Sequence, residues 1–137
     1  MRPTARFIAL PIAALLVSCH PSPQAIPAPH GADARTVLGF LSAYGRRDLD
    51  GMMKFLDEGA VFLGSDGVLT KAQIRDFFQT SFRKHPKLLV EVGSLKEVQG
   101  AIQASVKVET DAIWTDTWIF ELKDHKIHRY SLASGRR

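Results

Sequence analysis

Residues 113–122 read IWTDTWIFEL, and the rest of the chain is organised around this stretch. Successive side chains of a β-strand point to opposite faces of the sheet. One face of this strand carries Trp114, Asp116, Trp118, Phe120 and Leu122. Because this face is large and aromatic, we expect it to lie inside. The opposite face is rich in β-branched residues and ends in a charge, so we expect it to be exposed or half-covered.

The segments on either side of this strand alternate in the same way. Residues 101–109 place apolar side chains at every second position, and residues 88–92 do so before them. Short turns at 99–100, 111–112 and 123–125 separate these runs, and residues 126–133 close the series. Alternation of this kind predicts half-buried strands joined as an antiparallel meander.

The first half of the chain has a helical pattern instead. A helix capped by Asp33 is expected to end at Gly45, with an apolar face of Val37, Phe40, Leu41 and Tyr44. Asp48 is expected to cap a second helix over residues 49–56, and a strand over 60–63 and an extension at 68–69 follow.

A third helix is predicted to begin with a capping box of Thr70 and Gln73 and to end at His85, before Pro86. Its apolar stripe is expected to hold Ile74, Phe77, Phe78 and Ser81. Helices followed by a run of hairpins predict an α+β domain, with about three helices packed on one face of a curved antiparallel sheet.

Three segments give this order a family resemblance: FLSAYGRRDLDGMMKFL (40–56), GAVFLGSDGVLTKAQIRDFF (59–78) and WIFELKDHKI (118–127). They resemble the NTF2-like, or SnoaL-like and ketosteroid-isomerase-like, cone fold over residues 34–133. This superfamily includes enzymes, ligand binders and assembly modules, so the resemblance implies a fold and not a function. The positions that match the three catalytic groups of ketosteroid isomerases hold Phe40, Gly64 and Trp118, so that mechanism is not expected.

Asp116 is the candidate catalytic residue of the inward face. Between Trp114 and Trp118 its carboxylate would lose hydration, which raises a carboxyl pKa and suits acid/base chemistry. The alternative is a structural role, in which Asp116 only accepts hydrogen bonds and orders the mouth of the cone. One of His128, Arg129 and Tyr130 is also expected to point inward.

A small, mostly apolar ligand in an aromatic-lined cone is the function that these residues favour. The residues expected to bind it are Trp114, Trp118, Phe120, Tyr44, Phe62 and Tyr130. Two alternatives stay open. One is an isomerase, dehydratase or hydrolase that uses Asp116, and the other is an interaction module of the cell envelope. A homodimer through the outer row of Ile113, Thr115, Thr117 and Ile119 would fit the second alternative.

Residues 1–18 form an expected signal peptide, with Arg2 and Arg6 before an apolar run at 7–17 that is too short to span a bilayer. Leu16-Val17-Ser18-Cys19 resembles the lipobox of bacterial lipoproteins, which implies cleavage before Cys19 and its lipidation with fatty acyl chains such as palmitate. The alternative is an ordinary secretory signal in which Cys19 is incidental. His20, rather than Asp, after the cysteine implies an outer-membrane location facing the periplasm.

Residues 19–33 contain four prolines and read as a tether from the membrane to a domain at 34–133, which a basic tail at 134–137 follows. Cys19 is the one cysteine of the chain, so no intrachain disulfide is possible. The net charge of +4 falls to +2 without Arg2 and Arg6, and the cluster Arg83, Lys84, His85 and Lys87 is read as a solvated helix end. A nucleic-acid partner, a cofactor and a metal site are therefore not expected.

Overall fold

The structure is a computed structural model that describes residues 31–135. The expected signal peptide, Cys19, the expected tether as far as residue 30 and the last two residues of the chain lie outside the described residues. The described chain contains these elements in order: α2 (Ala32–Gly45), α3 (Leu49–Lys54), β1 (Leu56–Gly64), β2 (Gly67–Thr70), α4 (Lys71–Lys84), β3 (Leu89–Val98), β4 (Ala101–Glu109), β5 (Ile113–Lys123), β6 (Lys126–Leu132) and the 3₁₀ turn η1 (Ala133–Gly135).

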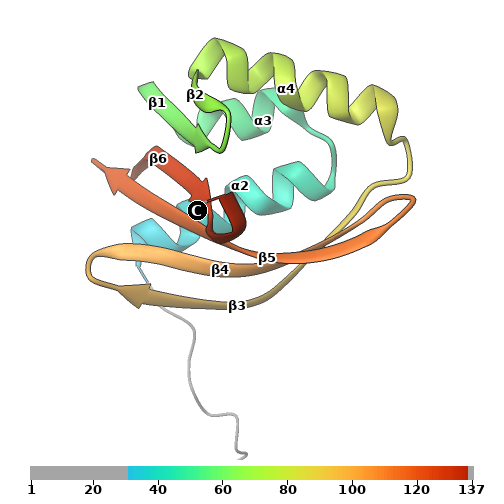
Figure 1. The fold of residues 1–137 in the computed structure, drawn as a ribbon. Coiled ribbons are helices and arrows are strands. Elements are labelled where there is room, and N and C mark those ends of the chain that lie inside the picture. Colours follow the sequence, from blue (N-terminus) through green and yellow to red (C-terminus); the bar gives the residue numbers. More distant parts are fainter. Residues whose placement is uncertain (1–30, 136–137) are drawn as a thin grey trace, which may run out of the picture.

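The six strands form one curved sheet in the order β2-β1-β6-β5-β4-β3. Neighbouring strands are antiparallel except β1 and β6, which run parallel. Parallel neighbours need a long connection, and α4 with the β3–β5 meander supplies it here. Figure 1 shows the helices on the concave side of the sheet, so the predicted α+β cone is confirmed, with a mixed sheet.

The register of β5 puts its aromatic row against the apolar row of β4. Ala104 pairs with Trp118 and Ile102 with Phe120, and all four side chains are buried. Trp114, near the start of the same strand, is 45% exposed. The face of β5 is therefore inward as predicted, but the burial begins only in the second half of the strand. In Figure 1 the β4–β5 turn extends beyond the end of α2.

Helix α2 buries the face that its apolar spacing predicts, and Val37, Phe40, Leu41 and Tyr44 are all buried. The cap is different from the prediction. Gly31 is the N-cap residue, and Asp33 lies inside the first turn, where its carboxylate contacts His125 Nδ1 at 2.9 Å. Asp33 was expected to bond to its own helix, but it joins the helix to the β5–β6 turn instead.

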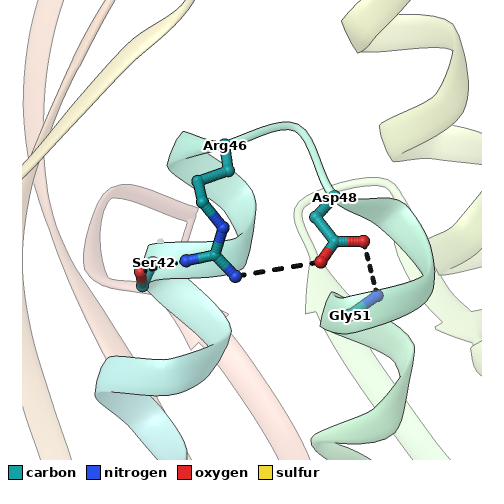
Figure 2. A network of polar contacts seen from close by, with 4 residues as sticks. All are labelled: Ser42, Arg46, Asp48 and Gly51. Atoms are coloured by element: carbon teal, nitrogen blue, oxygen red, sulfur yellow. Dashed lines mark hydrogen bonds and ion pairs between the residues drawn. The ribbon is translucent and has the colours of Figure 1, made fainter.

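Figure 2 shows how the chain passes from α2 into α3. The Arg46 guanidinium donates to Ser42 Oγ at 2.6 Å and lies 3.8 Å from the Asp48 carboxylate. Asp48 accepts a hydrogen bond from the backbone N–H of Gly51 at 3.0 Å, as a helix cap does. The predicted cap is confirmed, but α3 ends at Lys54 because Leu56 already belongs to β1.

Helix α4 begins with the predicted capping box of Thr70 and Gln73 and ends with His85 as its C-cap. Ile74 and Phe78 are buried, but Phe77 is 53% exposed, so its expected place in the core was wrong. The reason is that α4 packs mainly against β1, β2 and α3, and Phe77 lies on a side of the helix that these elements leave uncovered. Among residues 31–135 no helix combines the length and apolar character needed to cross a membrane.

Candidate functional site

A cavity of about 340 Å³ opens between α4, the end of α2 and the strands β1, β5 and β6. Its volume is at the lower end of the range of small-molecule sites, which starts at roughly 300 Å³. Most of the wall is apolar. The apolar and aromatic residues that line it are Tyr44, Phe62, Phe77, Phe78, Leu88, Trp114, Trp118, Tyr130 and Leu132.

The aromatic rings of this wall hold one another in place. Tyr44, in the last turn of α2, lies with its ring centroid 5.1 Å from that of Phe78 and 5.6 Å from that of Trp118. Tyr130 stacks on Trp118 at 6.0 Å and lies 4.7 Å from Phe62. Ring pairs at such distances are mutually stabilising, so this wall is formed before any ligand arrives.

Both tyrosines of the chain line this cavity. Burial raises the pKa of Tyr44 from 10.0 to about 12. Burial also raises the pKa of Tyr130 well above its ordinary value, and the nearby Tyr44 raises it further by charge repulsion. Both phenols therefore stay protonated over the physiological range, and each is a neutral group that can donate a hydrogen bond to an oxygen of a ligand.

The polar part of the wall comes from the end of α4 and from the β4–β5 turn. It consists of Thr80, Ser81, Lys84, His85 and Thr110. His85 Nδ1 is buried and has no hydrogen-bond partner among residues 31–135. Of the described residues, no aspartate or glutamate lines the cavity, so every charged or hydroxyl group of the wall can donate a hydrogen bond.

Five of the residues predicted to bind a ligand lie together in this wall: Tyr44, Phe62, Trp114, Trp118 and Tyr130. The sixth, Phe120, lies behind it. Its side chain has no exposed surface and packs against Phe40, Trp118 and Tyr130. Phe120 can therefore support the wall but does not reach a ligand in this structure. Binding by the other five stays a prediction.

Asp116, the candidate catalytic residue, is not part of the cavity wall. Its carboxylate accepts hydrogen bonds from the backbone N–H of Thr117 at 2.8 Å and of Ser134 at 3.2 Å. The Ser134 hydroxyl donates a further, short hydrogen bond to it. This is the structural arrangement that was the alternative for Asp116, with Ser134 as the main donor. The bonds attach η1 to β5.

Of the three residues weighed on β6, Tyr130 points inward. Arg129 Nε lies 3.6 Å from the Glu121 carboxylate, and His128 Nδ1 lies 2.8 Å from that of Asp57. Asp57 Oδ1 is buried and lacks a hydrogen-bond partner within the described part of the chain. Neither of these pairs borders the cavity. Within residues 31–135 no three His, Cys, Asp or Glu side chains come close enough together to hold a metal ion.

The sequence interpretation missed the contribution of α4 to the site. Phe77 and Phe78 were assigned to the core, and Lys84 and His85 to a solvated helix end. The missed signal is the helical spacing itself, because residues 77, 81 and 84 follow one another at intervals of four and three on one side of a helix. Thr110 carries no signal, since only the closing of the β4–β5 turn brings it to the cavity.

No known family model matches this chain, and no curated protein matches it significantly. Solved structures do. An uncharacterised cystatin-fold protein from Novosphingobium aromaticivorans is similar with a TM-score of 0.68 and 15% identity, over 75% of this chain and 98% of that one. An NTF2-like protein of unknown function from Cytophaga hutchinsonii has a TM-score of 0.62 and 15% identity, over 78% and 92%. AusH from Aspergillus nidulans has a TM-score of 0.66 and 11% identity, over 77% and 85%. At these identities the likeness concerns the fold alone, and the chain has the NTF2-like α+β cone fold.

Proposed function

We propose that this domain binds a small, mostly apolar molecule in its aromatic-lined cavity. The observation that carries the proposal is the continuous wall of aromatic side chains around a volume of about 340 Å³. Ligand sites combine such apolar walls with a few polar groups that fix the orientation of the ligand. Tyr44 and Tyr130 supply two such groups here, since both phenols stay neutral and can donate a hydrogen bond.

The expected affinity from apolar contact alone is modest. Burying roughly 150 Å² of apolar ligand surface contributes about 4 kcal/mol at 25 cal/mol per Å². This corresponds to a Kd of about 1 mM before the cost of association is counted. Useful affinity therefore requires the polar groups of the wall in addition to the rings, and a ligand with at least one hydrogen-bond acceptor fits better than a pure hydrocarbon.

Tryptophan fluorescence tests the proposal directly, because the chain has two tryptophans and both line the cavity. Small apolar compounds that carry one acceptor group should shift or quench the emission in a saturable way. Trp114→Phe leaves Trp118 as the single reporter and should keep the saturable response, since Trp118 is the more buried of the two. If a broad set of such compounds leaves the emission of the purified domain unchanged, the proposal is wrong.

We also propose that Cys19 anchors the mature protein in the bacterial outer membrane. The support comes from the sequence around Cys19, because the segment that follows is polar and proline-rich and offers no apolar helix to the bilayer. Acyl chains contribute about 0.8 kcal/mol per buried CH₂, and stable retention takes more than one chain. Cells labelled with a radioactive fatty acid should incorporate label into the wild-type protein and not into Cys19→Ser. Unlabelled wild-type protein in the soluble periplasmic fraction would contradict the anchor.

The other two alternatives have less support. An enzyme that uses Asp116 would need that carboxylate to turn from Ser134 toward the cavity. A homodimer through the outer sheet face stays a prediction, which light scattering of the concentrated domain tests. Ile113 on that face is 60% exposed, but the neighbouring Arg129–Glu121 and Lys107–Glu91 pairs give the face a polar character.

A further inference from the structure

The cavity wall is asymmetric in its chemistry, and this asymmetry indicates which ligand it suits. One end is formed by Lys84 and His85 at the end of α4, with Thr110 from the β4–β5 turn. Figure 1 shows these two segments on the same side of the molecule. The other end is formed by Phe62, Phe77 and Leu132, which are all apolar.

Charge favours an acidic group at the Lys84 end. Lys84 is the one charged lysine or arginine that lines the cavity in the described chain, and no described carboxylate opposes it. The end of α4 carries the negative pole of the helix dipole, which acts against an anion with about half an elementary charge. Arg83 and Lys84 both lie in the last turn and carry full positive charges, so the net charge at this helix end is positive.

His85 adds an unsatisfied polar group at the same end. Its Nδ1 is buried and lacks a hydrogen-bond partner within the described residues, although its backbone N–H is bonded to the Ser81 carbonyl oxygen at 2.9 Å. The following residue is also held, because the Arg47 guanidinium donates to the Pro86 carbonyl oxygen. A buried polar atom without a partner is unfavourable. A ligand oxygen that accepts a hydrogen bond from the imidazole, after a small rotation of the ring, would supply the missing partner.

The apolar end continues beyond the cavity. A neighbouring depression of about 490 Å³ shares Phe62, Phe77 and Leu132 with the cavity and extends along the β1–β2 hairpin past Val68. Phe77 and Val68 are more than half exposed there, at 53% and 57%. Phe77 precedes Lys84 by seven residues of one helix, which corresponds to about 10 Å. The apolar and the cationic ends are therefore about 10 Å apart along the helix, so one elongated molecule can contact both.

We infer that the ligand is an elongated amphiphile with a carboxylate head, bound with the head at Lys84 and His85 and the apolar body along Phe77 and Phe62. This inference rests on the proposed function and specifies the class of molecule that the cavity takes. The carboxylate accepts charge-assisted hydrogen bonds at the polar end, and the chain covers the exposed rings at the other end. The cavity selects against cationic amphiphiles of the same length.

The test uses three probes that share one apolar chain: decanoate, decan-1-ol and decylamine, each titrated below its micellar concentration at neutral pH. Tryptophan emission reports binding. Decanoate should bind more tightly than decanol by about three- to tenfold, the range of an exposed charge-assisted hydrogen bond, and decylamine should bind most weakly. The preference should shrink as salt is raised. Equal binding of the three probes, or a preference for the amine, overturns the inference but leaves the proposed function standing. If none of the three binds, the proposed function itself loses its support.

Two variants locate the head group. Lys84→Gln should lower the affinity for decanoate toward that for decanol and leave decanol unchanged. Lys87→Gln is the matched control, because Lys87 is exposed and does not line the cavity, so the same loss of charge should change neither affinity. An equal effect of both lysine variants would mean that only the overall charge matters, which overturns the assignment of the head group.

His85→Phe separates ligand recognition from packing. The change keeps a ring of similar size and removes both nitrogens. If His85 holds the carboxylate, decanoate affinity falls several-fold and decanol affinity stays the same. If the unpaired nitrogen is only a packing defect, the variant becomes more stable to urea and binds decanoate as the wild type does, and the part of the inference that concerns His85 is wrong.

Discussion

Alkaline titration of the two tyrosines tests their burial in the cavity wall most directly. Tyr44 and Tyr130 are the only tyrosines in the sequence, so the phenolate absorbance of the protein reports on the cavity alone. Burial raises the pKa of Tyr44 to about 12 and raises that of Tyr130 well above its ordinary value. We expect almost no phenolate near pH 10 while the domain is folded.

The sign of the effect on stability follows from the protons bound in each state. An unfolded tyrosine ionises near pH 10, whereas folded Tyr44 keeps its proton until about pH 12. Between these values the unfolded state binds fewer protons, so the free energy of unfolding falls as the pH rises. The stabilisation that the raised pKa gives to the folded state is fully present below pH 10, and it is lost as the pH rises to the pKa of the folded state. Each tyrosine contributes about 1.4 kcal/mol per pH unit, or roughly 3 kcal/mol for Tyr44 over the whole interval.

The two tyrosines together should then remove roughly 5 kcal/mol by pH 12, which is comparable to the total stability of a small domain. The domain should therefore unfold within this interval, and both phenols should ionise in the same cooperative step. The assay compares phenolate absorbance with far-ultraviolet circular dichroism along one pH titration. Tyr44→Phe should halve the absorbance change. It should also reduce the pH dependence of the unfolding free energy by about 1.4 kcal/mol per pH unit relative to wild type. Phenolate that appears gradually near the ordinary tyrosine pKa, with an unchanged circular dichroism spectrum, would refute the burial of the two phenols.

Three further predictions concern the framework around the site. Phe40→Ala should lower the free energy of unfolding by about 3–5 kcal/mol in urea titrations, because the side chain has no exposed surface and packs on three other rings. Gly39→Ala should destabilise by about 1–3 kcal/mol, since its Cβ would lie 2.5 Å from Phe55 Cζ. In a Phe55→Ala background the same change should instead stabilise by up to about 1 kcal/mol. If Gly39→Ala lowers the free energy of unfolding equally in both backgrounds, the contact with Phe55 is contradicted. Asp116→Asn should speed hydrogen exchange at the Ser134 amide by roughly threefold to tenfold without altering ligand affinity, whereas a loss of binding would place Asp116 in the site.

Much of the fold could be predicted from the sequence because it depends on local patterns. The capping box of Thr70 and the cap of Asp48 satisfy backbone groups within the same few residues, and so they work wherever the helix lies. The alternation of residues 101–109 and the aromatic row of residues 114–122 identify the inner face of the sheet, since a strand that is covered on one side must alternate. Trp114 and Trp118 of the cavity wall were found in this way.

Other features depend on contacts between residues far apart in the chain, and no local period encodes these. The Asp33 carboxylate contacts His125, which is 92 residues away in the sequence, and the Asp116 carboxylate accepts a hydrogen bond from Ser134. Phe77 and Phe78 are neighbours in the sequence, yet the limited cover of α4 buries one and exposes the other. The sequence by itself therefore determined the helices, the strands and the aromatic face. Only the tertiary structure decided that Lys84 and His85 close the cavity, because that depends on where α4 ends relative to β5.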